Sequence, residues 1–487
     1  MIFYIYSCIF LSVDGKLRTN TFVKWRTNKL SEKLSSLSRL VKESLPQSIE
    51  ELVEFCRIPS ISSQNKSIGE AVQFLVEKIT SMGGIVEVLD EVPGGFPVLY
   101  VHFEAGVKGN STKTLLFYNH YDVQPPEPLE EWESEPFEVS TRDGKLFARG
   151  IADNKGDLMA RLTAIELLQK QDGGLPCHIK FLLEGEEEIG SPNLSYYLEK
   201  YSELFKADAC IWEHADRDEK NRVQLMAGVK GMAYFELSVQ TAVMDLHSKT
   251  GPLAENAAWR LTHALASMKN SKHEILVDGF YDHILPPTEL ELNYVNKMPF
   301  DEQSFRENYG LKAPLITNYS GQDPREAYIL NPTMTICGIE SGYYGEGSKT
   351  VLPKKALAKL DCRLVPGQEP EYIHKVIVNH LQKHGFSDVK VKLLNGVKAY
   401  RSDLSDPFVE LMVRTAEEVY DCEVVLSPNN AGTGPMTDVG HNLKLPIVST
   451  GVGWAQSKLH APNESIRTSD YKEGILHIAH VIQEFSK

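Results

Sequence analysis

The order of strand-like and helix-like segments constrains this fold more than any other feature of the sequence. From about residue 35, short apolar runs typical of buried strands alternate with helical patterns. Val98–Phe103 and Thr114–Tyr118 are expected to be buried strands, and Gly156–Lys170 is expected to be a helix with one apolar face. The same rhythm returns after Asp403. This pattern predicts an α/β domain with a largely parallel sheet.

The middle of the chain has a different pattern. Along Phe235–Val239 and Ala356–Leu364, apolar and polar residues alternate, as in strands with one exposed face. Residues 272–326 are rich in Pro, Asn, Asp and Gly and are expected to be irregular. The sequence therefore predicts one discontinuous α/β domain interrupted by a small α+β domain. The predicted parts are an extension over 1–30, the α/β domain over 31–227 and 401–487, and the inserted domain over 228–400.

Acidic and histidine side chains cluster where the predicted strands end, which is where open α/β sheets place their ligands. These clusters provide imidazoles and carboxylates but no thiolates. A mixed nitrogen and oxygen set suits zinc, manganese or cobalt, and a bridging carboxylate suits a pair of such ions. The five clusters are His120–Asp122, Asp153–Asp157, Glu184–Glu188, Glu213–Asp216 and His460–Glu464.

Taken singly, each cluster also has an ordinary structural interpretation. His120 is either a metal ligand with Asp122 behind it or a hydrogen-bonded loop histidine. Asp153 is either a ligand or the cap of the helix that follows. The adjacent carboxylates of Glu186–Glu188 are either a solvated charge run or a site where a cation removes their repulsion. The metal interpretation therefore rests on the five clusters occurring together.

Charge and cysteine content exclude several classes of partner. The 66 acidic residues exceed the 51 basic residues, which gives a formal net charge of -15. Nucleic acids and anionic membranes favour basic surfaces, so neither is an expected partner. The seven cysteines are scattered and form no CxxC motif. We therefore expect free thiols in a reducing compartment, and hence a cytoplasmic protein, without a disulfide framework or a thiolate zinc site.

The amino terminus leaves several interpretations open. Met1–Val13 is almost wholly apolar, but it is shorter than the roughly 20 residues that span a bilayer. No basic residue precedes it and no signal-cleavage pattern follows it. A weak export or membrane segment, a flexible extension and a mis-assigned start codon all fit this pattern, and no membrane association is expected.

The motifs, in this order, resemble those of metallopeptidase family 20. This family includes carnosinases, cytosolic non-specific dipeptidases, aminoacylases and acetylornithine deacetylases. The resemblance covers about residues 50–480 and is strongest to the carnosinase and non-specific dipeptidase branch. It is carried by HYDVQPPEP, RGIADNKGD, LLEGEEEIGS, DACIWE, DLHS, GSKTVLPKKALAKLDCRLVPGQ and LHAPNE.

The resemblance implies a zinc-peptidase-like, mixed-sheet catalytic domain that holds two divalent ions, with zinc preferred over manganese or cobalt. Asp153 is expected to bridge the ions and to be followed by a cis peptide bond to Asn154. Glu187 is expected to act as general base and acid on a water between the ions, and Asp122 to orient His120. The implied metal ligands are His120, Asp153, Glu188, Glu213 and His460.

The resemblance also implies that the inserted domain is a ferredoxin-like lid that forms a homodimer. His247 is expected to reach the partner subunit's active site and stabilise the oxyanion. Arg363, Thr350 and Thr433 are expected to hold the carboxylate end of the substrate. Thr433 stands where the dipeptidase branch has Ser, and DLHS is followed by Lys249–Pro252 in place of the expected Gly-rich run, so substrate preference stays open.

The expected function is therefore hydrolysis of the amide bond of dipeptides or similar small peptides. An N-acyl amino acid deacylase or desuccinylase that uses the same site is the nearest alternative. A non-catalytic relative that acts as a binding protein is a third, although Glu187 and every implied ligand are present.

Overall fold

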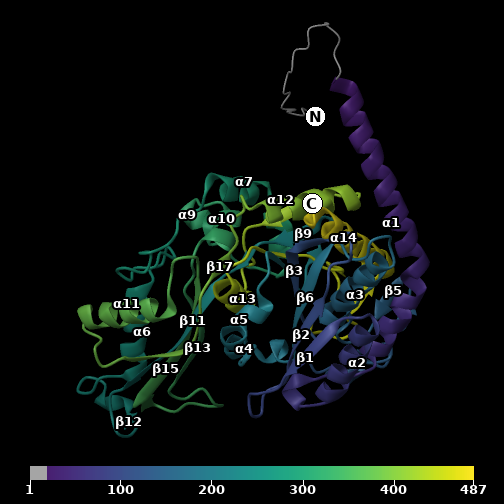
Figure 1. The fold of residues 1–487 in the computed structure, drawn as a ribbon. Helices are drawn as coiled ribbons and strands as arrows, with labels where there is room; N and C mark the ends of the chain where they lie inside the picture. The colour runs from purple at the N-terminus through teal and green to yellow at the C-terminus, as the bar shows by residue number, and fades with distance from the viewer. Residues whose placement is uncertain (1–18) are drawn as a thin grey trace.

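The computed structural model describes residues 19–487, with side chains described from residue 32. The apolar segment Met1–Val13 lies outside the described residues. Helix α1 (Thr19–Cys56) begins within the predicted extension and runs along one side of the molecule (Figure 1).

A mixed sheet of ten strands forms the centre of the larger part of the molecule. Its order is β1-β2-β6-β3-β7-β19-β9-β8-β20, with β18 also paired to β9. Strands β6, β3, β7 and β19 are mutually parallel, whereas β1 and β2 are antiparallel additions at one edge. The strands are β1 (Ile85–Leu89), β2 (Val98–Phe103), β3 (Asn110–His120), β6 (Cys177–Glu184), β7 (Ala209–Trp212), β8 (Asp216–Arg217), β9 (Val223–Met226), β18 (Val424–Ser427), β19 (Ile447–Ser449) and β20 (Gly453–Trp454).

Helices cover both faces of this sheet. Along β3, Leu115 and Phe117 face one core, and Leu116 and Tyr118 face the other. Burial on both faces explains why such strands have continuous apolar sequences. The first core is completed by α1, α2 (Ile68–Ser81), α3 (Gly156–Gln169), α12 (Pro407–Val419) and α14 (Thr468–Phe485). The second is completed by α4 (Leu194–Lys200), α5 (Ser202–Phe205) and α13 (Met436–Leu443).

A second sheet of four antiparallel strands has its own hydrophobic core. Its strands are β11 (Gly231–Gln240), β13 (Thr335–Ser341), β15 (Lys355–Leu364) and β16 (Lys390–Val397), in the order β13-β15-β11-β16. Helices α6 (Ala257–Met268) and α11 (Pro370–Lys383) pack on one face. The βαββαβ order and this strand arrangement are those of a ferredoxin-like fold. The predicted fold class, a mixed-sheet α/β part interrupted by an α+β part, is confirmed.

The prediction that residues 272–326 are irregular is wrong for much of this segment, which contains short helices. Side chains of Thr288, Asp301 and Asp323 cap three of them. Helices of four to nine residues are too short to show a clear helical period, which explains the error. The helices are α7 (Glu289–Lys297), α8 (Glu302–Asn308), α9 (Thr317–Ser320) and α10 (Pro324–Leu330).

These helices lie beside the larger part of the molecule (Figure 1). Glu291 in α7 forms a buried ion pair with Arg401, at 2.6 Å, and Asn429 donates a hydrogen bond to the Ile329 carbonyl. The segment that contains α7–α10 therefore links the two sheets.

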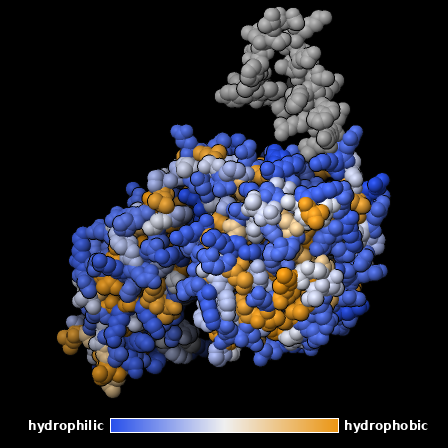
Figure 2. All heavy atoms as spheres, viewed as in Figure 1, coloured by the Kyte–Doolittle hydropathy of each residue, from blue (hydrophilic) through white to orange (hydrophobic). Residues whose placement is uncertain are grey.

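Several small elements complete the fold. At the tip of the small-sheet part, β12 pairs with β14 (Figure 1). The apolar side chains of Val243, Met244 and Leu253, in the segments next to β12, are exposed. Figure 2 shows hydrophobic surface at this tip. The short strands are β4 (Ser140–Arg142), β5 (Lys145–Phe147), β10 (Gly228–Val229), β12 (Leu246–His247), β14 (Val351–Leu352), β17 (Tyr400–Arg401) and β21 (Ser465–Arg467). The short helical turns are η1 (Ser62–Gln64), η2 (Leu129–Glu131), η3 (Ile151–Lys155), η4 (Glu187–Ile189) and η5 (Ser248–Thr250).

Two further sequence expectations concern membranes and thiols. Within residues 19–487, no helix combines the length and the apolar character that crossing a bilayer requires. The six cysteines in this range are all free thiols, as expected.

Candidate metal centre

The carboxyl ends of the parallel strands bring five side chains together at one edge of the large sheet. His120 ends β3, Glu188 lies in η4 just after β6, and Glu213 directly follows β7. Asp153 lies in η3, immediately before α3, and His460 comes from the loop between β20 and β21. We call these five residues the histidine–carboxylate cluster. Open α/β sheets bind their ligands at this edge.

The two oxygens of Asp153 face different histidines. Oδ1 lies 3.0 Å from Nε2 of His120, and Oδ2 lies 3.2 Å from Nε2 of His460. A second carboxylate accompanies each histidine: Glu213 Oε2 is 3.7 Å from His120 Nε2, and Glu188 Oε2 is 3.2 Å from His460 Nε2. The cluster therefore consists of two halves that share Asp153.

These distances fit a pair of metal sites. Nitrogen and oxygen ligands at about 2.0–2.2 Å from a tetrahedral zinc ion lie roughly 3.3–3.5 Å from one another. The four separations within the cluster, from 3.0 to 3.7 Å, bracket this value. Glu213 Oε2 is buried and has no hydrogen-bond partner among the described residues. The donor set, its spacing and this unpaired oxygen all fit divalent cations.

The charges of the cluster strongly perturb its ionisation. Burial opposes protonation of His120, but hydrogen bonds with Asp122 and Asp153 raise its pKa well above the usual value. Burial, followed by the charge of Glu187, raises the pKa of Glu213. At His460, hydrogen bonds with Asp153 and Glu188 raise the pKa to about 10. The protein thus concentrates negative charge here, and either protons or cations must balance it.

Glu187 lies beside the cluster without belonging to either half. Burial raises its pKa to about 7. The charge of His120 lowers this pKa, and the charge of Asp153 raises it. A carboxyl group whose pKa lies near neutrality can both accept and return a proton.

The two ring nitrogens of His120 have different partners. Nε2 faces the cluster, whereas Nδ1 lies 3.0 Å from the Asp122 carbonyl and 3.3 Å from the Asp122 carboxylate. Asp122 is itself held in place by the backbone N–H of Glu188, at 3.1 Å. This arrangement orients the ring, as a carboxylate behind a metal-bound histidine does.

Three further residues, Asn154, Gln124 and Arg161, support the cluster through hydrogen bonds to the backbone or to a ligand carboxylate. Asn154 donates to the Glu213 carbonyl at 2.8 Å, and Gln124 donates to the Glu188 carboxylate at 2.9 Å. The buried Arg161 donates to the carbonyls of Tyr118, two residues before the end of β3, and of Trp212, the last residue of β7. Asn154 and Gln124 lie within the RGIADNKGD and HYDVQPPEP motifs, whereas Arg161 lies outside every motif that carries the resemblance. The Asp153–Asn154 peptide bond is cis, as predicted.

Two of the expected substrate-binding residues contact each other. Arg363 in β15 donates to the hydroxyl of Thr433 at 2.9 Å and to Asp361 at 3.0 Å. Arg363 thus comes from the small sheet and Thr433 from the larger part, so this contact spans both.

His247 and Thr350 form a separate pair. His247 is exposed in β12, and the backbone of Thr350 lies beside it, accepting a hydrogen bond from Ser248 at 3.0 Å. Within residues 32–487, no hydrogen bond or ion pair joins either side chain to the histidine–carboxylate cluster. The structure therefore brings together the expected metal ligands but not these two residues.

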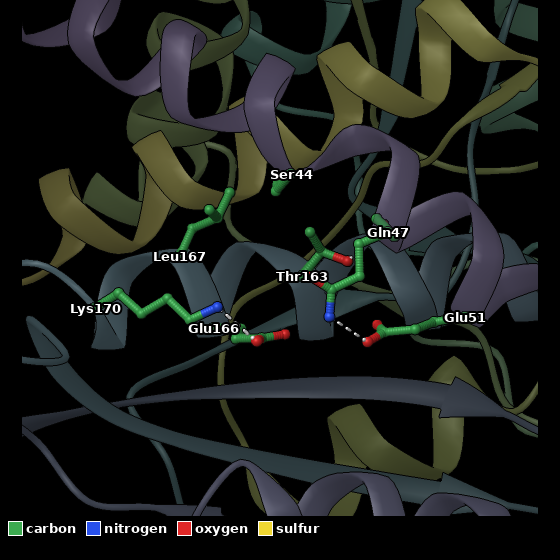
Figure 3. Close-up of a pocket in the computed structure, with 8 residues that line it drawn as sticks. Ser44, Gln47, Glu51, Thr163, Glu166, Leu167 and Lys170 are labelled. Carbon is green, nitrogen blue, oxygen red and sulfur yellow. Dashed lines mark hydrogen bonds and ion pairs between the residues drawn. The ribbon is translucent and has the colours of Figure 1, made fainter.

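A small pocket elsewhere does not compete with this site. It lies between α1 and α3 (Figure 3) and is lined mainly by Gln47, Glu51, Thr163, Glu166 and Lys170. Its volume of about 20 Å³ suffices for one water molecule. Figure 3 shows its polar side chains engaged in pairs, Gln47 with Glu51 and Lys170 with Glu166.

Comparisons with known proteins agree with the motifs. The family model described as peptidase family M20/M25/M40 matches residues 116–484. The Beta-Ala-His dipeptidase of Mus musculus is 26% identical over 479 residues, which cover 94% of this chain and 96% of that protein. The Cys-Gly metallodipeptidase dug1 of Schizosaccharomyces pombe is 26% identical over 467 residues, covering 91% and 96% respectively.

Solved structures share the fold. The M20 family metallo-carboxypeptidase Sso-CP2 from Sulfolobus solfataricus superposes with a TM-score of 0.79 at 37% identity. The match covers 90% of this chain and 99% of that one. The dipeptidase Dug1p from Saccharomyces cerevisiae has a TM-score of 0.73 at 23% identity, covering 93% and 98%.

Proposed function

The chain belongs to peptidase family M20/M25/M40, and we propose that it is a metal-dependent dipeptidase with a dinuclear centre at the histidine–carboxylate cluster. The observation that carries this proposal is the position of Asp153 between two equivalent halves, with one oxygen toward His120 and the other toward His460. Relatives named Beta-Ala-His dipeptidase and Cys-Gly metallodipeptidase, each matched over nearly the whole chain, support the substrate class.

The proposed ligands divide between two ions. His120 and Glu213 would hold one ion, His460 and Glu188 would hold the other, and Asp153 would be shared between them. When bound, such ions polarise a carbonyl and lower the pKa of a shared water. We assign zinc because the family resemblance implies it. The imidazole and carboxylate donors accept zinc, and they also accept manganese and cobalt.

Glu187 is the proposed general base and acid. Its pKa of about 7 matches a group that takes a proton from the attacking water and later returns it to the leaving amine. Asp122 keeps His120 in the orientation that directs Nε2 to the cluster.

Arg363 and Thr433 are the proposed recognition site for the substrate's carboxylate. Thr350, which lies beside His247 and apart from this pair, would contribute together with His247. A guanidinium group binds a carboxylate through two parallel hydrogen bonds. Arg363 is one-third exposed, at 33% of its side chain, so it can accept a ligand. Its hydrogen bond to Thr433 connects the small sheet to the larger part, which contains the cluster.

We further propose a homodimer in which residues 228–400 form the lid and dimerisation domain. His247 lies outside its own chain's cluster, so a role in stabilising the oxyanion requires it to enter the partner's site. Two features support such an interface: the exposed apolar tip around β12, and the edge strand β13, where Ile336 and Ile339 are exposed. The six free thiols favour a reducing compartment such as the cytoplasm.

A second candidate activity is removal of carboxy-terminal residues from longer peptides. The Sulfolobus solfataricus relative is named a metallo-carboxypeptidase and is 37% identical. Both activities use the same centre and the same carboxylate recognition, and they differ in how much chain precedes the cleaved bond.

A substrate panel separates these activities. Metal-stripped protein is reconstituted with Zn²⁺, Mn²⁺ or Co²⁺ and given dipeptides, longer peptides and N-acyl amino acids. A dipeptidase cleaves the dipeptides fastest, and only when a metal is present. Turnover limited to longer peptides supports the carboxypeptidase, and turnover limited to N-acyl amino acids supports the deacylase. Dipeptide hydrolysis that is unaffected by metal removal contradicts the proposal.

A further inference from the structure

A second group of metal-binding side chains lies far from the cluster. His102 is in β2, Glu104 follows directly after β2, and His178 is in the neighbouring strand β6. The antiparallel register pairs Phe103 with Ile179, so Glu104 and His178 come opposite each other at the end of the two strands. All three side chains point to the same face because residues two apart in a strand share a face.

This group and the histidine–carboxylate cluster lie at opposite ends of strand β6. His178 is near the amino end of β6, and Glu184 at its carboxyl end pairs with His120. Six residues of strand separate His178 from Glu184, which corresponds to about 20 Å. The two groups therefore do not share a ligand.

The spacing of the three side chains is that of metal ligands. Nε2 of His102 lies 3.3 Å from Nδ1 of His178, which in turn lies 3.3 Å from Oε2 of Glu104. One ligand atom from each residue lies within 4.8 Å of the others. Two imidazole nitrogens on one tetrahedral zinc ion lie roughly 3.3 Å apart.

We propose that His102, Glu104 and His178 bind one transition-metal cation, represented by Zn²⁺, at a site distinct from the proposed dinuclear centre. Two imidazoles and one carboxylate are the donors that zinc accepts, and solvent water completes the coordination. Glu104 is exposed, at 67% of its side chain, and keeps the site accessible from solvent.

The surroundings are compatible with a cation. The nearby ammonium group of Lys180 is turned away, donating to the carbonyls of Leu204 and Lys206 at 2.7 and 2.8 Å. Binding must replace one existing interaction, the hydrogen bond from the Ala105 N–H to Nδ1 of His178, at 3.2 Å.

Such an ion would join the carboxyl end of β2 to the amino end of β6. Beyond Glu104 the chain leaves the sheet, and β1 and β2 form its edge. The expected consequence is a more stable edge with little effect on hydrolysis, since the site is about 20 Å from Glu184. A ligand that binds only the folded state raises its stability.

The test is the number of zinc ions per chain. Metal-free full-length protein is titrated with ZnCl2 against a chromophoric chelator, and bound zinc is measured by elemental analysis. We expect His178→Gln to bind one zinc fewer per chain than wild type while retaining wild-type hydrolysis after reconstitution. Because Glu104 is exposed, Glu104→Gln keeps the fold and is expected to weaken this zinc at least about tenfold.

Glu87→Gln serves as the matched control, because Glu87 is an exposed acid on the adjacent strand β1. It removes the same charge without removing a ligand and should leave the zinc count unchanged. Equal counts in wild type, His178→Gln and Glu104→Gln would overturn the proposal, as would an equal loss in Glu87→Gln. The difference between variants is independent of how many ions the histidine–carboxylate cluster binds, so failure here is distinguishable from failure of the dinuclear proposal.

Discussion

Glu464 accepts a hydrogen bond from the backbone N–H of Asp153 at 3.0 Å, although the two residues are 311 positions apart. The same fully buried carboxylate accepts from the N–H groups of Gly150 and Ala152 and pairs with Arg149 at 2.6 Å. Asp153 thus owes its position to a side chain from the returning segment of the chain. His460, four residues before Glu464, lies 3.2 Å from Oδ2 of the same aspartate.

Glu464→Gln is therefore expected to weaken metal binding at the cluster. An amide presents a donor where one of the N–H groups or Arg149 now donates, so the loop that carries Asp153 shifts. Loss of such a supporting contact lowers metal affinity by about 10–100-fold. The measurement is activity as a function of added Zn²⁺, in which excess metal restores part of the lost turnover.

A general loss of stability would not be rescued by metal. Glu418→Gln provides the comparison, because Glu418 pairs with His480 at 2.7 Å away from the cluster. It should lower the melting temperature without changing the zinc dependence. Equal zinc dependence of wild type and Glu464→Gln would contradict the positioning role.

Glu187→Gln should separate metal binding from hydrolysis. The amide cannot accept the proton of the attacking water, so turnover is expected to fall by roughly 10²–10⁴-fold. Glu187 is not among the proposed ligands, so the metal content should stay at the wild-type value. Elemental analysis and initial rates on the same preparation test both parts. Wild-type turnover in this variant would exclude Glu187 as the base.

Arg363→Lys should impair recognition of the substrate's carboxylate. Lysine keeps the charge but loses the two-pronged geometry and the hydrogen bond to Thr433. A lost charge-assisted hydrogen bond of about 1.5–3 kcal/mol corresponds to a rise in KM of roughly 10–150-fold. A dipeptide amide, which lacks the carboxylate, should be an equally poor substrate for wild type and variant.

Arg260→Lys is the control for this prediction, because Arg260 binds Asp388 at 2.6 Å on the outside of the small-sheet part. Its KM values should match wild type. A similar rise in KM for the dipeptide and its amide in Arg363→Lys would show that Arg363 does not read the carboxylate.

Local sequence patterns predict the elements that are long or strongly patterned. Val98–Phe103 is the strand β2 at the predicted residues, and α3 ends one residue before the predicted Lys170. The acidic motifs after β3, β6 and β7 converge because parallel strands end at the same edge of the sheet. For these motifs, the position directly after a strand is enough to predict that the side chains meet in the fold.

Contacts between distant segments have no such local signal. Glu464 appears in the LHAPNE motif, but nothing in the sequence connects it to the backbone of residues 150–153. The approach of His102 to His178 depends on β2 and β6 being neighbours, although β3 lies between them in the chain. Such relationships follow from strand order, which periodicity alone does not determine.

The buried His477 predicts how stability depends on pH. Its imidazole lies between Thr415 and Thr450, at 3.2 and 3.4 Å, and burial lowers its pKa to about 3. The unfolded chain binds this proton near pH 6.5, but the folded chain does not. His477 thus contributes stability that is complete above about pH 6.5 and is lost progressively as the pH falls toward 3.

His477→Gln should therefore flatten the acid limb of the stability curve. One proton taken up only on unfolding contributes about 1.4 kcal/mol per pH unit, and the variant lacks this contribution. The variant is expected to be less stable than wild type at pH 7, because it loses packing and hydrogen bonds, but to lose less between pH 6 and 4. Urea unfolding of metal-free protein across this range measures the slopes. His263→Gln, whose ring on α6 is exposed, should keep the wild-type slope. If His477→Gln also keeps it, the imidazole is already protonated in the folded protein, and burial does not hold it neutral.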